Sequence, residues 1–167
     1  MQADKISYDA AKEFAPFLRG SNDRATLKNV WRFVRENIRY VRDPEHEEVV
    51  KTPGCTLSEG KADCKSMTVL VGSILRALGY DFVYRVAFYD KRTPQQGHIY
   101  SVVHLDGEVI VVDPVHDTFD EELHAWKFND YTPAGSAGLG SIPRRTGLFS
   151  NPLTWAVVAA FILLIND

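Results

Sequence analysis

Three side chains in this sequence have the types and spacing needed for nucleophilic acyl chemistry, namely Cys64, His98 and Asp113. In such chemistry a thiol attacks a carbonyl carbon, a histidine takes up the thiol proton, and a carboxylate orients the imidazole. The three residues therefore form a candidate Cys-His-Asp triad, provided that the surrounding elements bring them together.

Cys64 lies at the start of a predicted helix. After Cys64, apolar residues recur with the period of one helix face, at Met67, Leu70, Val71, Ile74, Leu75 and Leu78. Asp63 is a suitable N-cap and Gly79 a natural stop. A thiol at this position faces unpaired N–H groups and the positive end of the helix dipole, which favour the thiolate. A small buried filler is the alternative role for such a cysteine.

His98 and Asp113 lie on the two strands of a predicted hairpin. The turn signal Asp106-Gly107 joins residues 98–105 to residues 108–113, so Leu105 pairs with Glu108. In this register His98 and Asp113 share a face and are diagonal neighbours, roughly 7–8 Å apart between backbones. The pattern predicts a His–Asp pair. Alternatively, His98 is an ordinary strand residue and Asp113 simply ends a strand before a proline.

The other residues with chemical potential have simpler interpretations. Cys55, in a Pro-Gly segment, is interpreted as incidental, and a disulfide with Cys64 is disfavoured in a reducing compartment. Trp31 and Tyr40 fall on or beside an apolar helix face, which is typical of core residues. The remaining histidines considered for a site are predicted to be surface or loop residues: His46, His116 and His124.

Several segments around these residues resemble the transglutaminase-like superfamily. The segments are Gly60 to Cys64 with its helix, His98-Ile99-Tyr100, and residues 111–114 (VVDP), preceded by residues 31–40 with their I-x-Y ending. The resemblance covers about Leu27 to Pro114. It rests on the joint order and spacing of these segments, because no single motif is specific. One departure is Ala62, which stands where the family often has glycine directly before Asp-Cys.

This resemblance implies an α+β fold of the papain-like type, with the cysteine helix packed on an antiparallel sheet. It also implies a cysteine enzyme that acts on amide bonds of protein or peptide substrates through a thioester. Hydrolysis, as by a peptidase or amidase, is predicted over transfer to an amine, as by a transglutaminase. The compact form also resembles transglutaminase-like proteins of phages and prophages. The alternative is a weakly active or non-catalytic assembly protein of a membrane or phage particle.

Composition and charge exclude several other classes. The apolar share of 45% and the charged share of 25% are ordinary for a globular domain. A net charge of −3 without a basic run argues against nucleic-acid binding. Two cysteines make no disulfide framework, and no zinc, metalloprotease or P-loop motif is present, so no metal or cofactor is predicted.

The remaining periodicities predict helices first and strands after. Residues 8–18 read as one helix, and a second is predicted from a cap at residues 21–23 through an apolar pattern that reaches Val41. Residues 43–59 read as a loop and residues 82–88 as a strand. This order predicts one α+β domain over residues 1–131.

The amino-acid composition changes in the C-terminal part of the chain. Residues 132–147 are rich in Gly, Ser and Pro and are predicted to be a linker. Leu148 to Ile165 carry no charge, and as a helix they would span roughly 27 Å, close to the ~30 Å hydrocarbon core. We interpret residues 148–167 as a membrane anchor. The alternatives are a helix packed on an apolar partner or in an oligomer, or a core helix of the same domain.

The flanks of this segment predict its orientation. Arg144 and Arg145 precede it and only Asn166-Asp167 follow, which places the domain on the cytoplasmic side of the membrane. The N-terminal residues have no hydrophobic signal core, so no secretory signal is predicted. If the protein comes from a phage, association with the virion is the alternative localisation.

Overall fold

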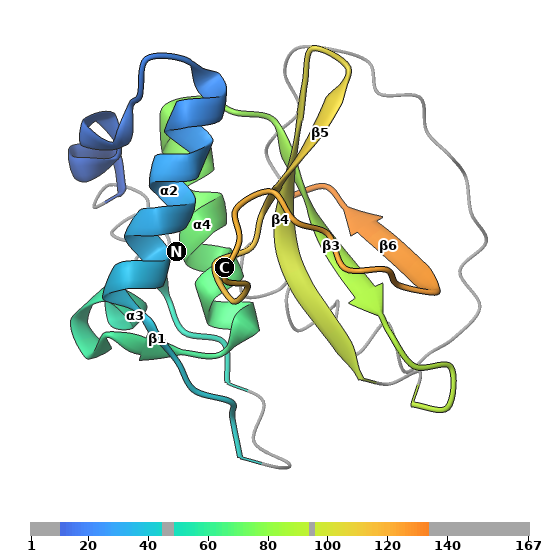
Figure 1. Cartoon of the computed structure of the whole chain (residues 1–167). Helices are drawn as coiled ribbons and strands as arrows, with labels where there is room; N and C mark the ends of the chain where they lie inside the picture. Colours follow the sequence, from blue (N-terminus) through green and yellow to red (C-terminus); the bar gives the residue numbers. More distant parts are fainter. Residues whose placement is uncertain (1–10, 45–48, 94–95, 134–167) are drawn as a thin grey trace.

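The computed structural model describes residues 11–44, 49–93 and 96–133. In Figure 1 the helices lie on one side of a four-stranded sheet. The elements in chain order are η1 (Ala15–Leu18), α2 (Asp23–Asn37), β1 (Arg39–Tyr40), α3 (Pro53–Glu59), β2 (Lys61–Ala62), α4 (Cys64–Leu78), β3 (Phe82–Phe88), β4 (Gly97–Leu105), β5 (Glu108–Val112) and β6 (Lys127–Tyr131). This is the predicted α+β arrangement of helices and an antiparallel sheet.

Helix α2 begins where predicted and ends earlier than predicted. Asn22 caps it by accepting a hydrogen bond from the N–H of Ala25 at 2.8 Å. The apolar pattern predicted that the helix reaches Val41, and this prediction was wrong. The chain leaves the helix after Asn37 because β1 pairs in parallel with β2, with Val41 N–H donating to Ala62 O at 2.8 Å. Pairing with β2 satisfies backbone groups that a longer helix would have satisfied internally.

Helix α3 lies within residues 43–59, which were predicted to be a loop, so that prediction was wrong for Pro53–Glu59. Thr52 accepts from the N–H of Cys55, Pro53 occupies the first helical turn, and Gly60 ends the helix with a φ of 61°. A threonine cap followed by proline, with glycine just past the end, is a helix signature at both termini. The sequence therefore carried the signal for this helix.

Helix α4 has the predicted bounds. The Asp63 carboxylate accepts from the N–H of Ser66 at 2.9 Å, and Gly79 ends the helix with a φ of 88°. Cys64 is consequently the first residue of the helix. The apolar face is buried against α2 and the sheet, and Thr68 donates from its hydroxyl to Ile99 O on β4 at 2.9 Å. This contact ties the start of α4 to the start of β4.

The sheet has the order β5-β4-β3-β6 and is antiparallel throughout. The predicted strand at residues 82–88 is confirmed as β3, and the predicted hairpin register is confirmed, with Leu105 opposite Glu108. Strand β6 was not predicted. It forms the edge of the sheet next to β3.

The sheet is buried on both faces. The larger core lies between helices and sheet and includes Leu27, Leu70, Ile74, Val103 and Ile110. A smaller cluster covers the other face, namely Val83, Ala87, Tyr100, Val102 and Val111 on alternate strand positions, with Ala125 from the segment before β6. Because both faces are packed, the ends of β4 and β5 are held rigidly.

Gly72 on α4 lies against the side chain of Tyr84 on β3, and this packing leads to a prediction. A Cβ at this position would overlap Tyr84 Oη and would lie 2.8 Å from Tyr84 Cζ. We expect Gly72→Ala to lower the free energy of unfolding by about 1–3 kcal/mol, because overpacking outweighs the better helix propensity of alanine. Urea denaturation measures this. In the control Gly54→Ala, the new Cβ meets nothing within 4 Å. Equal midpoints for Gly72→Ala and wild type would contradict the packing.

The predicted C-terminal segments lie outside the described residues, which end at 133. The linker from 134 onward, the helix at 148–167 and the domain boundary derived from them therefore stay predictions. Within residues 11–133 as described, no helix is long and apolar enough to cross a membrane.

Candidate active site

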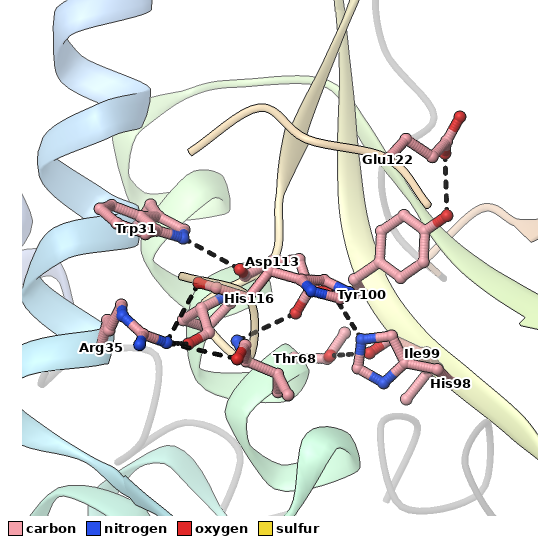
Figure 2. A network of polar contacts seen from close by, with 11 residues as sticks. Trp31, Arg35, Thr68, His98, Ile99, Tyr100, Asp113, His116 and Glu122 are labelled. Carbon is pink, nitrogen blue, oxygen red and sulfur yellow. Dashed lines mark hydrogen bonds and ion pairs between the residues drawn. The ribbon is translucent and has the colours of Figure 1, made fainter. Parts of the chain in front are cut away.

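His98 and Asp113 meet at the end of the sheet where β4 begins and β5 ends. The distance between His98 Nε2 and Asp113 Oδ2 is 2.5 Å, and the side chains are only 16% and 3% exposed. Figure 2 shows the imidazole facing the aspartate. The diagonal pairing expected from the hairpin register thus exists as a short, largely buried contact.

Cys64 contacts the same imidazole from the first turn of α4. Burial of His98 works against its charged form, but hydrogen bonds to Asp113 and to Cys64, and the negative charge of both, outweigh burial and raise the pKa of His98 to about 9. Because Asp113 engages Nε2, the other ring nitrogen, Nδ1, is left for the thiol. The structure therefore brings the three predicted residues together, with His98 in the middle.

Asp113 is fixed from two further directions. Its backbone carbonyl accepts from Trp31 Nε1 at 2.9 Å, and its carboxylate Oδ1 accepts from the N–H of Val115 at 3.1 Å. These bonds leave Oδ2 directed at His98, as Figure 2 shows. Trp31, predicted as a core residue, packs partly buried against the core and also supports the site.

The start of α4 is held by a buried carboxylate. Asp63 is 3% exposed, and besides capping the helix it pairs with Lys65, with 2.6 Å between Lys65 Nζ and Asp63 Oδ2. Lys65 also contacts Asp43 at 3.3 Å. This network fixes the helical turn that carries Cys64.

Tyr40 lies beside Cys64, which its interpretation as a core residue did not anticipate. It is 45% exposed, so that interpretation was wrong. Partial burial and then the negative charges of Cys64 and Asp63 raise the pKa of Tyr40. Its phenol is therefore neutral at physiological pH. Because β1 pairs with β2, the strand directly before Cys64, Tyr40 is placed on the rim of the candidate site.

His116 belongs to the site although it was predicted to be a surface or loop residue. Its Nε2 lies 3.5 Å from Asp113 Oδ2, and its ring stands perpendicular to that of His98 with centroids 5.6 Å apart. The side chain is 24% exposed. The N–H of His116 donates to Asp113 O across a turn that contains Pro114. An Asp-Pro pair that opens a turn is a signal for this proximity. Of the other two histidines, His124 is exposed and His46 lies outside the described residues.

One wall of the site is aromatic. The ring of Tyr100 lies 5.5 Å from that of His98, and its hydroxyl donates to Glu122 Oε1 at 2.8 Å. Tyr89 is 40% exposed, and burial, then the charges of Asp113 and Glu122, raise its pKa to about 12. The tyrosines of this wall therefore stay neutral over the pH range in which His98 titrates.

Both cysteines are free thiols. Cys55 donates from its thiol to Glu59 Oε1 at 3.1 Å, and this bond, with desolvation and the charge of Glu59, raises the pKa of Cys55. A raised pKa disfavours the reactive thiolate. Cys64 is thus the better candidate nucleophile.

A cysteine at the start of a helix, packed on an antiparallel sheet that supplies histidine and aspartate, defines a papain-like arrangement. The chain matches the transglutaminase-like superfamily over residues 12–127 and belongs to that family. No curated protein sequence matches it significantly.

Solved structures share the fold at low sequence identity. Calcium-bound LapG of Legionella pneumophila is 17% identical, with a TM-score of 0.53 over 71% of this chain and 68% of LapG. A candidate cysteine protease from Cytophaga hutchinsonii is 21% identical, with a TM-score of 0.50 over 68% of this chain. A candidate protease from Parabacteroides distasonis is 14% identical, with a TM-score of 0.53 over 62% of this chain. The chain spans 37% and 23% of the latter two proteins.

The raised pKa of His98 predicts a pH-dependent stability. A group whose pKa is higher in the folded than in the unfolded state stabilises the fold fully at a pH below its unfolded-state pKa, which is 6.5 for histidine. This contribution of His98 is lost as the pH rises through its folded-state pKa of about 9. We expect wild type to lose about 1–3 kcal/mol more than His98→Asn between pH 6.5 and 9. Urea titrations of both proteins across this range measure the difference. Parallel stability profiles would show that His98 carries no such charge.

Proposed function

We propose that this protein is a cysteine enzyme that attacks amide bonds of protein or peptide substrates and hydrolyses them through a thioester. The observation that supports this best is the position of His98, which contacts Cys64 and lies 2.5 Å from Asp113. One imidazole linked to a thiol and a carboxylate is the arrangement that a nucleophilic cysteine requires.

In the first half of the reaction, Cys64 Sγ attacks the amide carbonyl. The protonated His98 donates its Nδ1 proton to the leaving amine as the carbon–nitrogen bond breaks. Asp113 stabilises the imidazolium throughout. The Cys64 N–H, at the first position of α4, has no acceptor within the helix and can stabilise the oxyanion.

In the second half, a nucleophile releases the acyl group from the thioester. With water, His98 takes a proton as general base and the product is a carboxylic acid. With an amine, the product is a new amide. Two of the similar structures are candidate proteases, which supports hydrolysis over transfer for this chain.

A blocked glutaminyl peptide tests the proposal and separates the two outcomes. The full-length protein is incubated with the peptide, with and without hydroxylamine, and products and intact protein are analysed by mass spectrometry. We expect an acyl adduct on Cys64, the free acid as main product, and neither in Cys64→Ala. The control Cys55→Ala should behave as wild type.

Different results are equally informative. Hydroxamate as the main product would assign the enzyme to amine transfer. Turnover that persists in Cys64→Ala would refute the thioester mechanism. The absence of any adduct, even with an activated acyl ester such as p-nitrophenyl acetate, would favour a non-catalytic role for the fold.

A further inference from the structure

We propose that His98, Asp113 and His116 form a binding site for a zinc-type divalent cation, and that a bound cation prevents His98 from serving Cys64. The consequence for catalysis rests on the proposed function. The binding itself depends only on the three side chains, so the two can be tested separately.

The geometry of the three side chains supports a metal site. One ligand atom from each lies within 4.8 Å of the others, with Asp113 Oδ2 common to both short contacts, 2.5 Å to His98 and 3.5 Å to His116. Ligands of a tetrahedral zinc ion at about 2.0–2.1 Å lie roughly 3.3 Å apart. The cluster reaches this spacing by movements of roughly 1 Å or slightly more, within the reach of side-chain rotation.

The backbone around the ligands is already fixed. Arg35 Nη1 donates to the carbonyls of Pro114 and His116 at 3.0 and 3.1 Å, and Arg35 pairs through Nη2 with Asp117. Figure 2 shows the Arg35 guanidinium bound to the turn that carries His116. The Val115 N–H holds the Asp113 carboxylate from behind. Such outer contacts orient ligands and raise metal affinity.

The donor set selects the class of cation. Two imidazole nitrogens and one carboxylate, with an open fourth position, suit Zn²⁺ and similar late transition metals. Ca²⁺ requires six to eight oxygen ligands, and Mg²⁺ also prefers oxygen. Both imidazoles are in contact with solvent, with 16% and 24% of their side chains exposed.

Binding changes the protonation of His98. The ion takes the place of the proton on Nε2, which is released to solvent, so the single remaining ring proton stays on Nδ1 and faces Cys64. A metal-bound imidazole in this form cannot accept the thiol proton and is a poor acid toward a leaving amine. The ion would therefore stop amide turnover without contacting the sulfur.

Cobalt binding tests the site directly. Co²⁺ is titrated into full-length Cys64→Ala and followed by its visible absorption, with Zn²⁺ as competitor. We expect one equivalent to bind, Zn²⁺ to displace it, and excess Ca²⁺ or Mg²⁺ not to. His116→Ala in the same background should weaken binding at least about 100-fold, because even outer-shell partners are worth 10–100-fold. The control His124→Ala removes an exposed histidine and should bind as the parent does.

Three outcomes would overturn the proposal. They are no saturable binding in Cys64→Ala, binding of full strength in His116→Ala, or binding of full strength in folded His116→Asn. In wild type, a sulfur-to-cobalt charge-transfer band would show that Cys64 is a ligand and would also contradict the proposed ligand set. These readouts need no turnover, so an inactive protein would refute the proposed function and leave the metal test intact.

Discussion

Replacing His98 by alanine is expected to slow acylation of Cys64 by at least about 100-fold, the lower range for loss of a general acid–base. Within the described residues the imidazole links the thiol to Asp113, so its removal takes away the positive charge beside the sulfur and, for amide substrates, also the proton for the leaving amine. The burst of product from p-nitrophenyl acetate, followed in a stopped-flow instrument, gives the acylation rate.

A matched control is available on the same strand. His104 lies on β4 but is exposed and six residues further along, so His104→Ala should keep the wild-type rate. Far-UV circular dichroism would establish that both variants fold. If His98→Ala acylated as fast as His104→Ala, the imidazole would have no part in the chemistry.

Changing Asp113 to asparagine is expected to have a comparably large effect, a loss of up to about 10⁴-fold in turnover, the size known for an aspartate-to-asparagine change in a catalytic triad. Asparagine keeps the size of the side chain and removes its charge. Desolvation, which lowers the pKa of His98, would then be opposed only by Cys64, so the pKa of His98 should fall well below about 9. NMR titration of the imidazole protons measures the pKa, and the peptide assay measures turnover.

Asp117→Asn serves as the control for this change. Asp117 is 89% exposed, pairs with Arg35, and lies four residues from Asp113, so its loss should leave the pKa of His98 unchanged. Asp113→Ala is a harsher variant, because it also removes the acceptor of the Val115 N–H and leaves buried groups unpaired. An unchanged pKa of His98 in Asp113→Asn would contradict the charge pairing.

The sequence was sufficient to predict the core of the site because its elements are local and regular. The Asp106-Gly107 turn determines the hairpin register, and the register determines that His98 and Asp113 are diagonal neighbours. Asp63 and Gly79 mark both ends of α4, so the placement of Cys64 at its first turn follows from helix signals alone. Only the docking of α4 onto the sheet is a tertiary event.

The features that were missed or misjudged depend either on tertiary contacts or on local signals that were interpreted differently. The end of α2 is decided by the pairing of β1 with β2, which lie far apart in sequence, and the apolar period alone does not show it. Tyr40 reaches the rim of the site through that same pairing. His116 depends on a turn, and its Asp-Pro signal was interpreted only as a strand end. Helix α3 carried clear capping signals that the acidic and proline-rich composition of its segment obscured.

The most direct test of the central claim is the relative alkylation rate of the two cysteines. Wild type and His98→Ala are treated with limiting iodoacetamide at pH 6 with a chelator, and labelling is assigned by peptide mass spectrometry. Cys55 is the internal reference, because the hydrogen bond to Glu59 raises its pKa. We predict that Cys64 reacts at least about tenfold faster than Cys55 in wild type, and that His98→Ala strongly reduces this preference. Equal rates at both cysteines, or a preference unchanged in His98→Ala, would contradict an activated nucleophile at Cys64.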